Sequence, residues 1–339
     1  MNTRMSKMES INNQPVNNRG ENNKALPRWL FSWESFLFAT VVCVFIINSF
    51  ASPYFLDPWS LSDATFNFSE KAIIALPLAL VIIVREIDIS VASIIALSST
   101  AMGFVAEAGA GILPICLAGM LVGVLCGLFN GLLVTRLNIP SIVVTIGTMS
   151  LFRGITYILL GDQALKNYPE SFAYFGQGYV VWVLGFEFVC FLILAVVFYV
   201  LLQRTNFGRR TYAIGNNPTA AFYSGINVAR HKLILFTLVG LFCGIASIML
   251  TSRLGSTRPT IALGWELNII TMVVLGGVSI LGGSGTIIGV VMSVFLMGLV
   301  TVGLGLLNVP GIVMSIIIGV MLISVIALPK IINLLKKNK

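Results

Sequence analysis

The sequence predicts an all-α, polytopic membrane protein with about ten transmembrane helices. Hydrophobic residues make up 57% of its 339 residues and charged residues only 10%, whereas soluble domains carry about 25% charged residues. The mean hydropathy is +0.95. Apolar runs long enough to cross a bilayer recur along the chain, and Lys and Arg gather between them. The net charge of +8 therefore belongs to loops and tails and does not indicate a nucleic-acid partner.

The two ends of the chain are polar and basic. Residues 1–35 are rich in Asn and carry an excess of Lys and Arg, so we expect a cytoplasmic tail without a packed core. Residues 36–328 form the expected transmembrane domain. Residues 329–339 form a second basic tail, which the same charge rule places in the cytoplasm.

Ten apolar segments account for the transmembrane domain. They are expected at about 36–50, 71–84, 89–106, 112–134, 140–160, 179–202, 233–251, 267–281, 286–306 and 310–328. Six spans then precede a basic loop at 203–232 and four follow it, which places both tails and this loop on the cytoplasmic side. The stretch 252–266 becomes an outer loop. Because the second and eighth segments are short, eight or nine spans is the alternative count.

The loop at 203–232 is the one long polar stretch inside the apolar domain. Its basic residues are Arg204, Arg209, Arg210, Arg230 and Lys232. A short helix is expected over 217–226, because Pro218 suits a first helical turn and glycines interrupt the chain around it. The loop is either an ordinary charged connection or a docking element for a cytoplasmic partner.

Two pairs of similar segments suggest an internal repeat. The segment REIDISVAS from Arg85 aligns without a gap to GGVSILGGS from Gly276. Paired interrupted segments in two halves are typical of a transporter's substrate pathway, although close packing of small residues is an alternative explanation. A second pair, NIPSIV from Asn138 and NVPGIV from Asn308, falls on opposite faces of the membrane in the expected topology and can be chance.

Several function classes are disfavoured. The sequence lacks the G-x-x-x-x-G-K-[ST] loop of ATP hydrolysis, and its five cysteines have no metal-ligand spacing, so we expect no catalytic residue, metal or cofactor. His231 is expected in an interfacial loop. Charges inside the apolar domain are few, which disfavours an ion-coupled carrier. Asp88 is either an ion-pair partner of Arg85 or a pathway residue, and Arg153 and Glu187 lie near helix ends, or pair with each other or with a neighbour.

Three motifs resemble those of one transporter family. The stretch RTNFGRRTYAIGNNPTAAFYSGI resembles the cytoplasmic coupling segment of sugar ABC-importer permeases, the family of the ribose, galactose, xylose, arabinose, rhamnose and autoinducer-2 permeases. VVLGGVSILGGSGTIIG is similar to the family's second signature and IDISVAS to its first. The resemblance covers nearly all of residues 36–328. Arg85-Glu86 replaces the glycine pair that usually precedes IDISVAS, a variant that favours the rhamnose-type members.

The resemblance implies a helical fold like that of the cobalamin-importer class, acting in a bacterial inner membrane with both termini cytoplasmic. Implied partners are an ATP-binding cassette ATPase, a periplasmic sugar-binding protein, a second permease copy or paralogue, and membrane lipid. The solute would be a monosaccharide, a pentose or a deoxyhexose such as rhamnose. An ion-coupled secondary carrier for a small polar solute is the alternative.

The resemblance also implies two sets of functional residues. The ATPase-coupling set is Arg209, Arg210, Gly215, Asn216, Asn217, Pro218, Ala220, Ala221 and Gly225. The translocation-pathway set is Asp88, Ser90, Ser93, Gly276, Gly277, Ser279, Gly282 and Gly283.

Overall fold

The computed structural model describes residues 33–337, so most of the expected N-terminal tail lies outside it. The helices are α1 (Trp33–Ala51), α2 (Pro58–Ile83), α3 (Val91–Glu107), α4 (Ile112–Arg136), α5 (Ser141–Leu160), η3 (Glu170–Ala173), α6 (Tyr174–Gln177), α7 (Phe186–Arg204), α8 (Asn206–Asn216), α9 (Pro218–Tyr223), α10 (Val228–Leu254), α11 (Trp265–Leu275), α12 (Ile287–Leu306) and α13 (Gly311–Lys337). Strands β1 (Tyr179–Val181) and β2 (Leu184–Gly185) form a small antiparallel hairpin, which the all-α prediction did not include.

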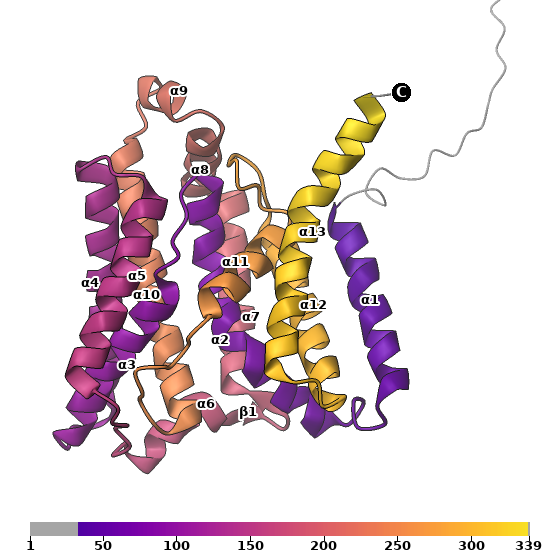
Figure 1. The fold of residues 1–339 in the computed structure, drawn as a ribbon. Helices are drawn as coiled ribbons and strands as arrows, with labels where there is room; N and C mark the ends of the chain where they lie inside the picture. The colour runs from indigo at the N-terminus through magenta and orange to yellow at the C-terminus, as the bar shows by residue number, and fades with distance from the viewer. Residues whose placement is uncertain (1–32, 338–339) are drawn as a thin grey trace, which may run out of the picture. The chain divides into compact units, whose positions relative to one another are not determined.

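Seven helices of the described chain are long and apolar enough to cross a membrane: α1, α2, α4, α5, α7, α10 and α12. Three shorter apolar helices accompany them, α3, α11 and the first part of α13, Gly311–Ser324. The helices lie side by side, with α8 and α9 at the same end as the C-terminal end of α13 (Figure 1). The described chain is therefore a polytopic helical membrane domain.

Helix α2 begins earlier than the sequence pattern suggested. The expected span started at Lys71, but the helix starts at Pro58, because the Asp57 side chain accepts a hydrogen bond from the Ser60 N–H at 3.0 Å and proline fits the first turn. Pro77 lies inside α2 without ending it. The predicted short second span is thus a helix of 26 residues.

Glycines bring α4 and α10 into close contact. A Cβ atom at Gly123 would collide with the Gly240 carbonyl, and one at Gly127 with the Phe236 carbonyl. Gly240 and Gly244 on α10 are equally tight against α4. Glycines four residues apart on both helices allow this backbone approach, which is how helices associate where lipid removes the hydrophobic driving force.

The chain contains an inverted repeat, and it follows the second of the two sequence pairs. Arg85 (φ 68°) after α2 and Gly255 (φ 59°) after α10 both adopt the left-handed conformation. Asn138 (φ 53°) and Asn308 (φ 54°) do the same, before α5 and α13. The separations agree, since 138 − 85 and 308 − 255 are both 53 residues.

This repeat corrects two sequence interpretations. The pair NIPSIV and NVPGIV is not chance: Asn138 borders the α9 end of the domain, whereas the α12–α13 connection lies at the opposite end (Figure 1), as an inverted repeat requires. The gapless pair from Arg85 and Gly276 is not the repeat, because Gly255 is the backbone counterpart of Arg85. The repeat relates two non-helical segments of the continuous chain, which we call chain breaks. They are residues 84–90 before α3 and residues 255–264 before α11.

Candidate functional site

The basic loop folds into two short helices rather than the single helix expected over 217–226. Thr205 caps α8 by accepting from the Phe207 N–H at 3.2 Å, and Asn217 caps α9 by accepting from the Ala220 N–H at 3.0 Å. The expectation of a loop position for His231 was wrong. His231 lies in α10, buried, with Nε2 2.9 Å from the Thr211 hydroxyl of α8, so it ties the segment to the domain.

The expected coupling residues divide into an exposed set and a buried set. Exposed are Arg209, Arg210, Asn216, Asn217, Ala220 and Gly225; Pro218 is half-buried; Gly215 and Ala221 are buried. Sequence reasoning missed two aromatic residues on α9, Phe222 and Tyr223, which are 64% and 84% exposed. Large apolar side chains at the tip of an extramembrane helix are a signal for a protein partner.

Gly215 lies at a three-way junction between α8 and the two membrane halves. A Cβ atom there would collide with the Ile83 carbonyl at the end of α2 and with the backbone of Gly283. The Gly283 N–H in turn donates to the Ile83 carbonyl at 2.9 Å. Three segments far apart in sequence therefore meet through their backbones, and any side chain at 215 would force them apart.

Arg85 fastens α8 to the end of α2. Its Nε donates to the Gly215 carbonyl and its guanidinium Nη2 to the Asn216 carbonyl, both at 2.6 Å. These are the last carbonyls of α8, which lack partners within the helix. Within residues 33–337, Arg85 forms no ion pair with Asp88, so the expected structural ion pair was wrong.

Two further contacts complete the attachment of α8 and its flanks. The Tyr212 hydroxyl donates to the Gly285 carbonyl at 2.6 Å, and Glu86 pairs with Lys232 at the start of α10. The α8–α9 segment is thus bonded to the break after α2, to the turn between α11 and α12, and to α10.

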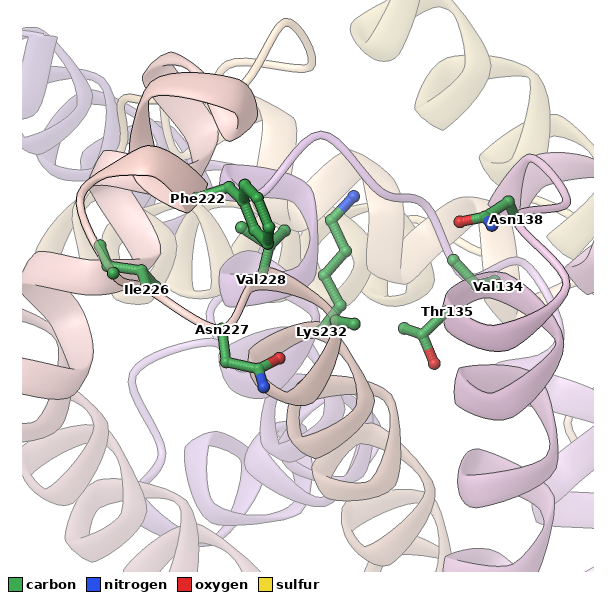
Figure 2. Close-up of a pocket in the computed structure, with 10 residues that line it drawn as sticks. Val134, Thr135, Asn138, Phe222, Ile226, Asn227, Val228 and Lys232 are labelled. Atoms are coloured by element: carbon green, nitrogen blue, oxygen red, sulfur yellow. The ribbon is translucent and has the colours of Figure 1, made fainter.

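A cavity of about 460 Å³ lies beside α9, between it and the end of α4. Figure 2 shows Phe222, Ile226 and Val228 on one wall, facing Val134, Thr135 and Asn138 on the other, with Lys232 between them. Because its lining combines apolar and amide side chains, the cavity can receive a side chain of a partner protein. Lys232 is already engaged by Glu86, so the cavity offers shape and apolar surface more than free charge.

The expected pathway residues separate into two groups. Ser90, Ser93 and Asp88 are buried in and just after the first break. The glycines lie in the turn between α11 and α12. Gly276 packs against Val290 and Gly277 against Trp33, while Gly282 and Gly283 border the α8 junction. In the same turn, Ser279 donates its backbone N–H to the Ser284 carbonyl at 3.0 Å. The two groups meet at the end of α2, where Gly283 donates to the Ile83 carbonyl and Gly282 lies against the Arg85 side chain.

Asp88 is held by its neighbours rather than by a cation. One of its oxygens accepts from the Ser90 N–H at 2.9 Å and from the Ser90 hydroxyl at 2.6 Å, and Asn130 donates to that hydroxyl at 2.8 Å. The other oxygen has no partner in the described chain. A fully buried carboxyl group of this kind is costly when ionised.

Asp88→Asn tests what this group contributes. The Asn carbonyl can accept the same two hydrogen bonds, so we expect the melting temperature of the purified protein to change little. Transport will fall only if the pathway needs the carboxyl group itself. Melting and uptake measured on the same variant distinguish the two: unchanged uptake with a lowered melting temperature would assign Asp88 a purely structural role.

Arg153 joins the 255–264 break to the first turn of α3, directly after the 84–90 break. Its Nη1 donates to the carbonyls of Pro259 and Ile261 at 2.7 and 2.8 Å, and its Nη2 to the Ala92 carbonyl at 3.1 Å. Sequence analysis allowed a pairing with Glu187, but Glu187 is buried elsewhere, with both oxygens unpartnered in the described chain. Arg153 instead supplies donors to irregular backbone, which at membrane depth must be satisfied by protein or water.

Comparison with known proteins agrees with this geometry. Residues 60–326 match the family model described as "Branched-chain amino acid transport system / permease component". The chain is 34% identical over 296 residues to the ribose import permease protein of Bacillus subtilis, covering 87% of this chain and 90% of the relative. It is 35% identical over 302 residues to the autoinducer 2 import system permease protein of Escherichia coli, covering 87% and 91%. No solved structure matches significantly.

Proposed function

The chain belongs to this family of transport permease components, and we propose that its solute is a monosaccharide, a pentose or a deoxyhexose such as rhamnose. It is a permease subunit of an ABC sugar importer, a multi-pass protein of the inner membrane, and a transport component rather than an enzyme. An ATPase and a substrate-binding protein are its partners.

The junction at Gly215 is the observation that supports a permease driven by a separate ATPase. A transporter driven by a separate ATPase needs a cytoplasmic element that is rigidly connected to the membrane helices it moves. Helix α8 meets that need, because Arg85 binds its last carbonyls at 2.6 Å and Tyr212 binds the turn before α12 at 2.6 Å. Movement of α8 by the ATPase would therefore displace both halves of the repeat together.

The coupling surface is the exposed part of α8 and α9. We assign to it the residues Arg209, Arg210, Asn216, Asn217, Pro218, Ala220 and Gly225, together with the exposed aromatics Phe222 and Tyr223. Gly215 and Ala221 are the buried members of the set and lie between this surface and the rest of the domain. The basic side chains would face anionic lipid headgroups or acidic groups of the ATPase.

The topology follows from adding the three short helices to the seven long ones. We propose ten spans, made of the seven long helices together with the shorter apolar helices α3, α11 and the first part of α13, in the arrangement of the cobalamin-importer class. The coupling loop and both termini then lie in the cytoplasm. Residues 36–328 form the permease domain between two cytoplasmic tails, and two permeases, identical or paralogous, pair in the membrane.

Crosslinking tests the coupling surface. With the native cysteines replaced, Tyr223→Cys is expected to crosslink to the ATPase encoded beside this chain, because Tyr223 is 84% exposed at the tip of α9. Trp182→Cys is the matched control, since Trp182 is 72% exposed on the hairpin at the opposite end of the domain (Figure 1). Equal crosslinking from both positions, or none from Tyr223→Cys in a complex that hydrolyses ATP, would refute the assignment.

One observation favours the alternative of an ion-coupled carrier. Glu70, Asp88 and Glu187 are fully buried carboxyl groups, and oxygens of Asp88 and Glu187 lack partners in the described chain; such groups bind protons in secondary carriers. Uptake into vesicles distinguishes the two. ATP-dependent uptake that survives an uncoupler supports the importer, and uptake without any ATPase supports the carrier.

A further inference from the structure

The segment between α10 and α11, expected as an outer loop, packs inward against α3 and α5. Arg153 stands 7 residues before Leu160, the last residue of α5, or about 10 Å from that helix end at 1.5 Å per residue. It nevertheless binds the carbonyls of Pro259 and Ile261 at 2.7 and 2.8 Å. The segment 255–264 therefore reaches toward the middle of the domain before α11 begins.

This segment is held firmly. Thr257 is fully buried, and its hydroxyl lies 2.6 Å from the Ser99 hydroxyl and 2.6 Å from the Tyr168 hydroxyl. Ala262 has a φ of 57°, an unusual conformation for a residue with a side chain. A strained residue inside a well-bonded segment indicates that the surrounding structure imposes its shape.

A cavity of about 430 Å³ opens beside this segment. It lies between the end of α10 and the start of α11, and its polar and aromatic lining comes from Arg253, Ser256, Arg258, Thr260 and Trp265. No carboxylate lines it. Its volume falls within the range of small-molecule sites, about 300–1,000 Å³.

The exposure of Arg258 indicates that the cavity is open to water. The Arg258 side chain is exposed and has no hydrogen-bond or ion-pair partner within residues 33–337, whereas Arg253 is held by both oxygens of Glu70 at 2.8 and 2.9 Å. An arginine is always charged, and an unpaired charge in contact with hydrocarbon is costly. Arg258 therefore faces water at the cavity, and its side chain is free to bind a solute there.

We propose that this cavity is an entry site in the permease for a neutral polyhydroxylated solute, with Arg258 donating hydrogen bonds to its hydroxyls and Trp265 offering its indole. This inference rests on the proposed importer function and specifies where the solute first contacts the membrane subunit. The Trp265 Nε1–H has no partner in the described chain either, so it is a further donor. Thr260 and Ser256 add hydroxyl groups that both donate and accept.

The Lys71 ammonium fixes one side of the Trp265 ring, 4.7 Å from its centroid. The ring therefore has a defined orientation before any solute arrives, which reduces the entropic cost of binding. The site borders the start of α11, and the turn that follows α11 reaches the α8 junction, so occupation of the site can be transmitted to that junction.

Accessibility labelling tests the site directly. With the native cysteines replaced, the complex with its ATPase is reconstituted in nanodiscs, and Arg258→Cys is exposed to a charged, water-soluble thiol reagent. We expect labelling, and we expect saturating ribose or rhamnose to slow it by about tenfold, the protection given by a ligand well above its Kd. If the cysteine at position 258 is not labelled, the cavity is not open to water and the proposal is refuted. If inorganic phosphate protects the cysteine and neither sugar does, the proposal of a neutral solute is refuted.

Uptake supplies the second measurement. Arg258→Gln and Trp265→Leu should each lower the maximal rate of binding-protein-dependent uptake by about tenfold, the effect of losing one charge-assisted contact, while basal ATP hydrolysis persists. Arg136→Gln, an exposed arginine at the end of α4, is the control and should transport normally. Normal uptake by both site variants overturns the entry site. If the unaltered complex shows no ATP-dependent uptake, the proposed importer function is refuted instead. The labelling experiment does not depend on uptake, so it tests the site separately.

Discussion

Replacing Gly215 with valine is expected to reduce ATP-driven uptake by at least about tenfold, because added methyl groups in a packed contact cost about 1–3 kcal/mol and 1.4 kcal/mol corresponds to a factor of ten. The new Cβ would meet the Ile83 carbonyl and the backbone of Gly283. It would push α8 away from the end of α2 and from the turn between α11 and α12 at once, whereas the exposed coupling surface would remain. Uptake and ATP hydrolysis should therefore become uncoupled.

The measurement is ATP hydrolysis and solute uptake by the same reconstituted complex. Gly147→Val is the matched control, since Gly147 also lies in a helix but a Cβ atom there would meet nothing within 4 Å. We expect the control to insert and transport normally. Normal uptake by the Gly215 variant would show that the junction does not transmit movement, and loss of the ATPase from the purified complex would show that Gly215 supports docking instead.

Arg153→Leu is expected to cause a large loss of stability. The carbonyls of Pro259 and Ile261 would lose their donor, and the Ala92 carbonyl at the start of α3 would lose one hydrogen bond. An unsatisfied buried polar group costs about 1–3 kcal/mol. The 255–264 segment would then separate from the start of α3, and transport would be lost.

Thermal unfolding in detergent checks this prediction. The melting temperature of Arg153→Leu should fall clearly below that of the unaltered protein, and Arg153→Lys should lie between them, because lysine keeps the charge but not the planar set of donors. Arg136→Leu, which removes an exposed arginine from the end of α4, should change little. A melting temperature equal to that of the unaltered chain would mean that the Arg153 hydrogen bonds are not what holds the 255–264 segment against the start of α3.

The sequence by itself determined the class of the protein and the position of its coupling segment. Hydrophobicity and charge act locally: a run of apolar residues must be buried in lipid or protein wherever it occurs, and clustered Lys and Arg must remain in water. The transmembrane class, the family and the polar segment at 203–232 could therefore be read without any knowledge of contacts. The orientation of the termini and the roles of the coupling residues stay predictions.

Only the tertiary structure decided how the parts work together. Arg85 binds the Gly215 carbonyl across 130 residues of sequence, and no local pattern distinguishes that partner from Asp88, three residues away. The inverted repeat is carried by left-handed backbone at residues as different as Arg85 and Gly255, so side-chain similarity conceals it. The 255–264 segment resembles an ordinary polar loop in sequence, and its inward path depends on hydrogen bonds with Arg153 and Ser99. Long-range hydrogen bonds set these features, and a single sequence does not encode them in any local periodicity.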